Sequence, residues 1–180
     1  FFDEMLSSAS LSFKLYSELS IGAYNCISHH ATDSIKNKFL PKMVQGKWSG
    51  TMCLTEPACG TDLGLLKTKA VEQSDGTYKL SGQKIFITSG DHDLTENIIH
   101  LVIARAVDSP AGTKGISLFL VPKFIVNEDG SIGPRNGVST GSIESKMGIK
   151  GSATCVLNFD DAAGYMIGPK NKGLNAMFTM

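Results

Sequence analysis

The first part of the chain repeats its apolar residues at the spacing of a helix. From Phe1 to about Ala31 they recur loosely every three to four positions, with few prolines or turn pairs to interrupt them, so one or two helices fit. A further helix is predicted to start at Thr32-Asp33 and to stop at Gly46. Pro41 inside it predicts either a kink or a restart of the helix.

After Trp48 the pattern changes to the alternation of β-strands. Runs rich in β-branched and aromatic residues, many of them bounded by turn pairs, are predicted to be strands. They cover Thr51–Thr55, Tyr78–Leu80, Lys84–Thr88, Ile98–Ala106, Ile116–Val121, Gly137–Glu144 and Ala153–Phe159. The stretch KLSGQKIFIT is predicted to be a hairpin closed by Ser81-Gly82, and NEDGSIGPRNG a loop. Helices followed by strands predict an α+β protein with a helical unit and a separate all-β unit.

Composition and charge narrow the choice of partners. Lys plus Arg equals Asp plus Glu at 17 each, so no net charge attracts nucleic acid or an anionic membrane. No apolar run reaches the ~20 residues of a membrane-spanning helix, and the start FFDEML lacks the basic residues of a signal peptide. The four cysteines form no CxxC pair and are expected to be free thiols. We therefore expect a cytoplasmic protein without nucleic-acid or membrane partners.

Several well-known site motifs are absent from the sequence. It contains no GxSxG, no Walker loop, no GxGxxG after a strand and no HExxH. The four histidines, His29, His30, His92 and His100, lack the spacing of a ligand set, so no metal site is predicted. Gly148–Gly151 formally matches the GxxG loop of a KH domain. It lacks the flanking helices, and the zero net charge argues against RNA binding.

Two loops remain as candidates for a ligand site. LTEPACGTD offers the Thr55 hydroxyl, Gly60, where a ligand can approach the backbone, and Thr61 beside Asp62. In KIFITSG, strict alternation would place Phe86 and Thr88 on one face of a strand. Such a pair could stack on a planar heteroaromatic ligand and hydrogen-bond to it. The alternative is that Phe86 belongs to the core and Thr88 is merely a β-former, and periodicity alone favours that alternative.

Several stretches together resemble the acyl-CoA dehydrogenase family. They occur in the family's order from about Asp33 to Met180: KNKFLPKMVQGKWSG, MCLTEPACGTD, YKLSGQKIFITSG, GISLFLVPK, KMGIKGSATCVLNFDDAAGYMIG and NKGLNAMFTM. ESKMGIKGSATC and FDDAAGYMIG look most like a longer bacterial branch of the family, which includes 3-methylmercaptopropionyl-CoA dehydrogenase.

The resemblance implies a division into domains. Residues 1–48 would be the end of an N-terminal helical domain, residues 49–168 an antiparallel β-barrel middle domain, and residues 169–180 the start of a C-terminal helical domain that is cut off. The sequence is thus expected to be a fragment of a longer chain.

The resemblance also implies a site for FAD. Carried over position by position, Met52, Leu54 and Thr55 would line the isoalloxazine ring, with Thr55 hydrogen-bonded to its pyrimidine side. Gly60 and Thr61 would lie where flavin and acyl-CoA meet, so Thr61 would also bind substrate. Phe86 stands where the family often has tryptophan and would pack on the flavin, while Thr88 would approach its N5 edge.

The activity implied is the α,β-desaturation of an acyl-CoA thioester in fatty acid metabolism. A carboxylate base removes a proton next to the thioester carbonyl, and flavin N5 takes a hydride from the next carbon. In the family the base lies in the C-terminal domain, which would follow Met180. We therefore assign this role to none of the glutamates Glu56, Glu128 and Glu144. Glu56 is expected to hold the loop conformation, and the fragment is expected to be inactive.

The implied partners are an acyl-CoA substrate, an electron-transfer flavoprotein as acceptor and further copies of the full-length chain. Two alternatives stay open. One is a flavoprotein of the same fold with oxidase-like or lost dehydrogenase activity, and the other is a non-enzymatic β-barrel binding module. The reaction of reduced flavin with oxygen separates the first from a dehydrogenase, and a lack of bound flavin would indicate the second.

Overall fold

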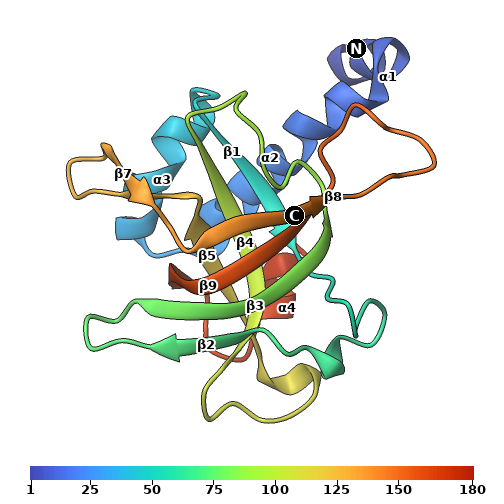
Figure 1. The fold of residues 1–180 in the computed structure, drawn as a ribbon. Coiled ribbons are helices and arrows are strands. Elements are labelled where there is room, and N and C mark those ends of the chain that lie inside the picture. Colours follow the sequence, from blue (N-terminus) through green and yellow to red (C-terminus); the bar gives the residue numbers. More distant parts are fainter.

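Helices precede a large sheet in this protein, as Figure 1 shows for the computed structural model of residues 1–180. The helices are α1 (Phe2–Ala9), α2 (Leu11–His30), α3 (Asp33–Val44) and α4 (Gly173–Met177), with short 3-10 turns η1 (Leu63–Leu65) and η2 (Thr113–Gly115). The strands are β1 (Trp48–Cys53), β2 (Lys69–Glu72), β3 (Tyr78–Ile87), β4 (Asn97–Ala106), β5 (Ile116–Pro122), β6 (Phe124–Val126), β7 (Ile132–Arg135), β8 (Val138–Ile143) and β9 (Cys155–Ile167). The predicted α+β class is confirmed.

The helical segment contains two helices before α3, and both α2 and α3 begin with a hydroxyl cap. The Ser10 side chain accepts a hydrogen bond from the Phe13 N–H at the start of α2, and Thr32 does the same for α3. The helix α3 continues through Pro41 to Val44 without a restart. Gly46 follows with a φ of +69°, a left-handed conformation that glycine adopts without strain.

The main sheet mixes parallel and antiparallel pairings. Its strand order is β1-β4-β2-β3-β9-β5, β8 pairs with β9, and β4 also pairs with β5, so that β4, β2, β3, β9 and β5 form a closed cycle of pairings. The pairs β1–β4 and β2–β4 are parallel, which differs from the antiparallel arrangement we expected. Parallel neighbours need a long connection, and the chain between β1 and β4, which contains β2 and β3, provides one.

The predicted hairpin KLSGQKIFIT is wrong. Ser81 and Gly82 lie inside one continuous strand, β3, which pairs with β2 on one side and β9 on the other. Gly82 has a φ of +153° beside a register shift in the β3–β9 ladder, so it marks a β-bulge and not a turn. The chain reverses earlier instead, at Gly76 between β2 and β3, where φ is +80°.

The predicted loop NEDGSIGPRNG also contains regular structure. Strands β6 and β7 form a separate two-stranded sheet within and beside it. This hairpin lies next to α3 (Figure 1), where Lys38 and Glu128 form an ion pair of 3.2 Å. The last strand, β9, is longer than predicted because it pairs in turn with β8, β3 and β5.

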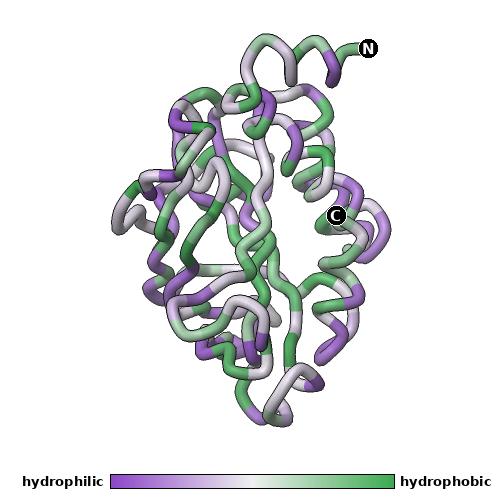
Figure 2. Tube along the Cα trace, turned by 90° about the vertical axis from the view of Figure 1, so that its right-hand side faces the viewer, coloured by the Kyte–Doolittle hydropathy of each residue, from purple (hydrophilic) through white to green (hydrophobic).

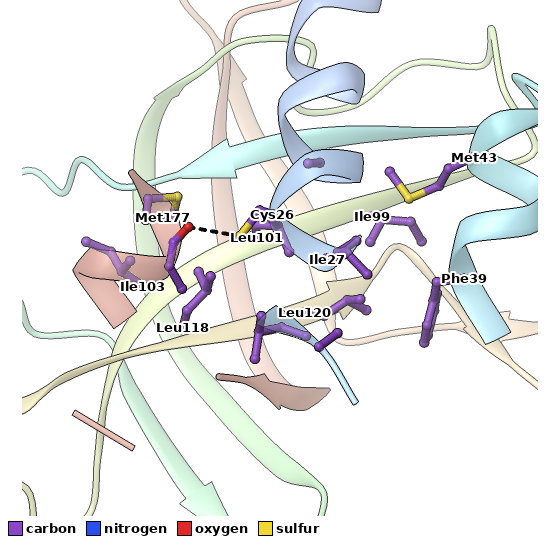
Figure 3. Packing of buried hydrophobic residues seen from close by; sticks show 14 of the residues in the cluster. Cys26, Ile27, Phe39, Met43, Ile99, Leu101, Ile103, Leu118, Leu120 and Met177 are labelled. Atoms are coloured by element: carbon purple, nitrogen blue, oxygen red, sulfur yellow. Dashed lines mark hydrogen bonds between the residues drawn. The ribbon is translucent and has the colours of Figure 1, made fainter. Parts of the chain in front are cut away.

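One apolar core joins the helices to the sheet. Side chains from α2, α3, β4, β5 and α4 meet in it, among them Cys26, Ile27, Phe39, Leu101, Leu118 and Met177 (Figure 3). The Cys26 thiol donates a hydrogen bond to the Ala176 carbonyl at 3.1 Å, which fixes α4 against α2. A second core lies within the cycle of strands and includes Leu80, Val102 and Leu157.

Hydropathy follows this arrangement. In Figure 2 hydrophobic residues run along the central strands, and hydrophilic residues are frequent in the outer loops. The helix α1 buries no residue and extends away from the sheet (Figure 1). None of the helices is both long and apolar enough to cross a bilayer. All four cysteines are buried free thiols, as expected.

Candidate functional site

The loop after β1 is held by a buried carboxylate. The Glu56 side chain is 4% exposed and accepts hydrogen bonds from the backbone N–H groups of Lys67 at 2.7 Å and Thr68 at 3.0 Å, and from the Thr68 hydroxyl. The backbone of Glu56 also exchanges two hydrogen bonds with Cys59. The interpretation that Glu56 holds the loop conformation is therefore confirmed.

The same carboxylate pairs with Lys84 on β3. The Lys84 side chain is fully buried, and its Nζ lies 2.9 Å from Glu56 Oε1 and 3.1 Å from the Leu54 carbonyl oxygen. Burial raises the pKa of Glu56, but the charge of Lys84 and the hydrogen bonds from Thr68 and Lys67 outweigh it, so the pKa lies below its usual value. Burial lowers the pKa of Lys84 against the attraction of Glu56.

The two predicted ligand-binding segments lie side by side. The Ile85 N–H donates a hydrogen bond to the Thr55 carbonyl at 2.9 Å, and Lys84 reaches the preceding residue, Leu54. Gly60 lies close to Thr55, because a Cβ placed on Gly60 would be 3.9 Å from Thr55 Cγ2. The structure thus brings Leu54, Thr55 and Gly60 next to the stretch that carries Phe86. Thr61 follows at the exposed end of the loop.

Phe86 does not lie on a regular strand face. Its φ is +59°, and the β3–β9 register shifts between Lys84 and Ile87, so Phe86 is the extra residue of a second bulge. Its side chain is 48% exposed, whereas Ile87 is buried. The expectation that strict alternation puts Phe86 and Thr88 on one strand face is wrong, since Thr88 lies in a turn just after β3. The alternative that Phe86 belongs to the core is also wrong.

The exposed ring of Phe86 has one charged neighbour. The Nζ of Lys146, in the loop between β8 and β9, lies 4.8 Å from the ring centroid, within the range of a cation–π contact. The same loop is fixed to α2 by Tyr16, whose hydroxyl accepts from the Ala153 N–H at 3.0 Å and donates to the Gly151 carbonyl at 3.2 Å. The helix α2, the end of β3 and the β8–β9 loop therefore meet beside Phe86.

Several donors at this junction have no partner within the chain. The hydroxyls of Thr55, Thr61 and Thr88 make no internal hydrogen bond, and the N–H groups of Thr55, Gly60 and Thr61 reach no backbone carbonyl. These residues are half-buried or exposed, so water or a ligand can reach them. An exposed aromatic ring beside unpaired donors suits a planar, polar ligand.

Two hollows of the molecule lie away from these residues. One of about 410 Å³ opens between α1, α2 and the start of β1, and is lined by residues such as Phe13 and Trp48. A more polar one of about 320 Å³ lies behind the loop, against Glu56 and Thr68. The predicted site residues line neither hollow, so they form an open wall and not a closed pocket.

Sequence reasoning missed Lys84 as part of this site. A lysine in a strand is usually exposed to solvent. Only the alternation of KIFIT, which puts Lys84 on the same face as Phe86, indicated an inward position, under the interpretation that Phe86 belongs to the core. The histidines of the neighbouring β4 and the loop before it have structural roles. His100 is fully buried and its Nδ1 lies 2.8 Å from the Thr51 hydroxyl, while the Nε2 of His92 contacts the Ser49 hydroxyl at 3.2 Å.

Comparison with known proteins gives one consistent result. The family profile described as "Acyl-CoA dehydrogenase, middle domain" matches residues 51–162. The 3-methylmercaptopropionyl-CoA dehydrogenase of Ruegeria pomeroyi is 48% identical over 177 residues, which is 98% of this chain and 30% of that protein. The chain thus spans about a third of the length of such curated relatives.

Two solved structures that resemble this chain are acyl-CoA dehydrogenases too. The butyryl-CoA dehydrogenase from Megasphaera elsdenii superposes with a TM-score of 0.78 at 33% identity, covering 98% of this chain and 44% of that one. An acyl-CoA dehydrogenase complexed with FAD from Bacillus anthracis superposes with a TM-score of 0.77 at 29% identity, covering 98% of this chain and 28% of that one.

Proposed function

This chain belongs to the acyl-CoA dehydrogenase family, and we propose that it forms one wall of the FAD site in an enzyme that desaturates an acyl-CoA thioester. Because the chain spans 30% of its relative from Ruegeria pomeroyi, the activity is proposed for the whole protein. The observation that carries the proposal is the hydrogen bond between Thr55 and Ile85, which sets the two candidate segments side by side.

The residues of this wall fit a flavin. A flavin needs a flat apolar contact for its ring system and hydrogen-bond partners along its edge. The exposed ring of Phe86 offers the contact, and the unpaired hydroxyls of Thr55 and Thr88 offer partners. Phenylalanine lacks the indole N–H of a tryptophan at this position, so the contact at Phe86 is apolar only. The FAD in the name of the Bacillus anthracis neighbour supports the same cofactor.

We assign the individual roles as follows. Met52, Leu54 and Thr55 line the ring system, with Thr55 on its pyrimidine side, and Thr88 approaches the N5 edge. Gly60 lets the ring and the substrate come close to the backbone, and Thr61 contacts both. When bound, FAD supplies the acceptor for the hydride. The protein's own contribution would be electrostatic, because the Thr55 hydroxyl and nearby N–H groups, which have no partner within the chain, could donate to negative charge that develops on the ring system.

The base for proton removal is proposed to lie outside these 180 residues. Glu56 is unsuited to the task, because its carboxylate is 4% exposed and already accepts hydrogen bonds from Lys67, Thr68 and Lys84. Glu128 is fully exposed and pairs with Lys38. Neither carboxylate is both desolvated and free of internal partners beside the wall. We accordingly propose no catalytic residue and no metal within this chain.

The remaining sequence-based expectations stay proposals. We propose the division into a helical part (1–48), a sheet-rich middle domain (49–168) and the start of a further helical domain (169–180). An acyl-CoA substrate, an electron-transfer flavoprotein as electron acceptor and self-association of the full-length protein belong to the same proposal. The cytoplasmic location also remains a prediction, whereas the expected resemblance to 3-methylmercaptopropionyl-CoA dehydrogenase is confirmed by the 48% identity to the Ruegeria pomeroyi enzyme.

The first test is the visible absorption spectrum of the full-length protein, followed by anaerobic addition of a panel of acyl-CoA thioesters. The proposal expects a yellow protein that one of the thioesters bleaches. A yellow protein that never bleaches, or whose reduced flavin reacts quickly with oxygen, would favour an oxidase-like or inactive relative. A colourless protein that takes up no FAD would indicate the non-enzymatic binding module.

A hydroxyl deletion tests the wall itself. Thr88→Val in the full-length protein keeps the shape of the side chain and removes one hydrogen bond to the flavin, so FAD should dissociate about tenfold more readily, equivalent to about 1–1.5 kcal/mol. Thr113→Val, at an exposed threonine of the 3-10 turn η2, serves as the matched control. Equal FAD affinities in the two variants would remove Thr88 from the site.

A further inference from the structure

A buried cation, Lys84, links the loop that carries Thr55 to the end of β3 that carries Phe86. Lys84 lies on β3 two residues before Phe86, and its side chain is fully buried. Its Nζ donates to the Leu54 carbonyl and to the Glu56 carboxylate, both in the loop that carries Thr55. The next residue, Ile85, donates its N–H to Thr55. Two successive residues of β3 therefore hold three successive residues of the loop.

Only an ionised carboxylate fits the hydrogen bonds around Glu56. The N–H groups of Lys67 and Thr68, the Thr68 hydroxyl and Lys84 all donate toward its two oxygens. A protonated carboxyl group would carry a donor of its own and could not accept all of them. A buried carboxylate needs a cation at contact distance, and Lys84 is the one that provides it.

Charge balance does not require the hydrogen bond from Lys84 to the Leu54 carbonyl. An ammonium group paired only with Glu56 would satisfy the buried charge, but Lys84 also reaches across to the backbone at 3.1 Å. This bond acts on the residue before Thr55, while the bulge at Phe86 begins directly after Ile85. The spacing between the Thr55 and Phe86 segments therefore depends on Lys84, over and above the stability that the ion pair gives.

We propose that Lys84 is a positioning residue, which holds Thr55 and Phe86 at the separation that a ligand between them requires. The proposal rests on the proposed function for the identity of that ligand, FAD. Lys84 touches neither cofactor nor substrate in this arrangement. It acts through Leu54 and Glu56, and Glu56 acts in turn through Thr68 and the Cys59 backbone.

The test separates positioning from stability with two variants of the full-length protein. Lys84→Met removes the charge and the Leu54 contact, and it leaves Glu56 buried without its cation. Glu56→Gln combined with Lys84→Met removes both charges, so the penalty for an unpaired charge disappears while the Leu54 contact stays lost. Lys79→Met, at an exposed lysine on the same strand, is the matched control.

The measurements are the melting temperature and the dissociation constant for FAD, taken well below each melting temperature. We expect Lys84→Met to lower the melting temperature and to weaken FAD binding at least tenfold. In the double variant the melting temperature should recover, but FAD binding should stay at least fivefold weaker than in the wild type. Recovery of both in the double variant, or unchanged FAD binding in Lys84→Met, would overturn the proposal.

Amide hydrogen exchange in the flavin-free wild-type protein supplies a test that needs no variant. The proposal expects the amides of Glu56, Cys59 and Ile85 to exchange as slowly as those of the central strand β4. Fast exchange at these amides would show that the segments are not held in place, and would overturn the proposal. If the wild-type protein binds no FAD, the proposed function fails, and the exchange result still decides whether the loop is held against β3.

Discussion

At the scale of single residues, the protein buries titratable groups in specific charge states. His100 is fully buried on β4, its Nδ1 bonded to Thr51 and its Nε2 without a partner. Burial is the main cause that lowers the pKa of His100 to about 3. Asp91 contacts Lys123, Arg135 and Thr140, and although burial acts against it, these hydrogen bonds and charges lower the pKa of Asp91 to about 2.

His100 should make the stability of the protein depend on pH. Its pKa is about 6.5 in an unfolded chain and about 3 in the folded one, so the unfolded state binds an extra proton between these values. Stability should therefore fall as the pH drops through this window, by about 1.4 kcal/mol per pH unit from this group alone. Urea unfolding of His100→Asn at pH 7, 6, 5 and 4 should show a shallower decline than the wild type.

The exposed residue His29 provides the control, since His29→Asn removes a histidine without touching the core. Parallel declines in the wild type and in His100→Asn would contradict the assignment. Asp91 does not confound this window, because a carboxylate with a lowered pKa stabilises the fold above its unfolded value near 4 and loses that effect only as the pH falls toward about 2.

At the scale of elements, the bulges of β3 determine where the candidate site lies. The first, at Gly82, lets the strand pass close to Thr68, since a Cβ on Gly82 would lie 2.6 Å from Thr68 Oγ1 and 2.8 Å from its Cα. Thr68 in turn donates to Glu56. The second bulge turns Phe86 outward and keeps Ile87 in the core. A regular strand would instead put Phe86 on the same face as the buried Lys84, because its side chains alternate strictly.

Two glycine substitutions, one in the β2–β3 turn and one inside β3, should have different costs. Both glycines have positive φ, but Gly76 has open space around it, whereas Gly82 approaches the Thr68 backbone. We expect Gly76→Ala to cost about 1 kcal/mol of backbone strain, and Gly82→Ala about 2–4 kcal/mol because steric overlap is added. Denaturant unfolding measures both. Equal costs would mean that Thr68 can move aside freely.

At the scale of the whole molecule, helices and sheet share one core. The cluster in Figure 3 draws on α2, α3, β4, β5 and α4, so none of these helices can leave without exposing apolar surface of the sheet. The single tryptophan, Trp48, lies at this boundary, with its ring 6.0 Å from that of Phe39 on α3. Its environment therefore reports on the contact between helices and sheet.

We expect residues 10–180 to unfold in one cooperative step. The shared core predicts that far-UV circular dichroism and Trp48 fluorescence of the isolated chain follow the same urea transition. Ile27→Ala, which leaves a cavity in that core, should shift both curves equally, by about 2–5 kcal/mol. A fluorescence transition at lower urea than the circular dichroism transition would mean that the helices detach from the sheet first.

The sequence predicted the local elements and the family, but not the pairing of strands. Hydrophobic spacing and hydroxyl caps were enough for α3, β4 and β5, because these signals lie within a few residues of each other. The Ser81-Gly82 pair was misleading, since the same residues suit a turn and a bulge, and only the neighbours β2 and β9 decide between them. The hairpin of β6 and β7 was missed because glycine-rich stretches give no alternation signal.

Some features of the candidate site likewise follow from the sequence, and others only from the tertiary structure. The sequence by itself determined which residue types are available: threonine hydroxyls, glycines and an aromatic ring in two motifs of a known family. The tertiary structure decided that Thr55 meets Ile85, that Phe86 faces outward and that Lys84 is buried against Glu56. These contacts join residues about 30 positions apart, and their energy depends on burial and charge pairing, which arise only when the sheet closes around them.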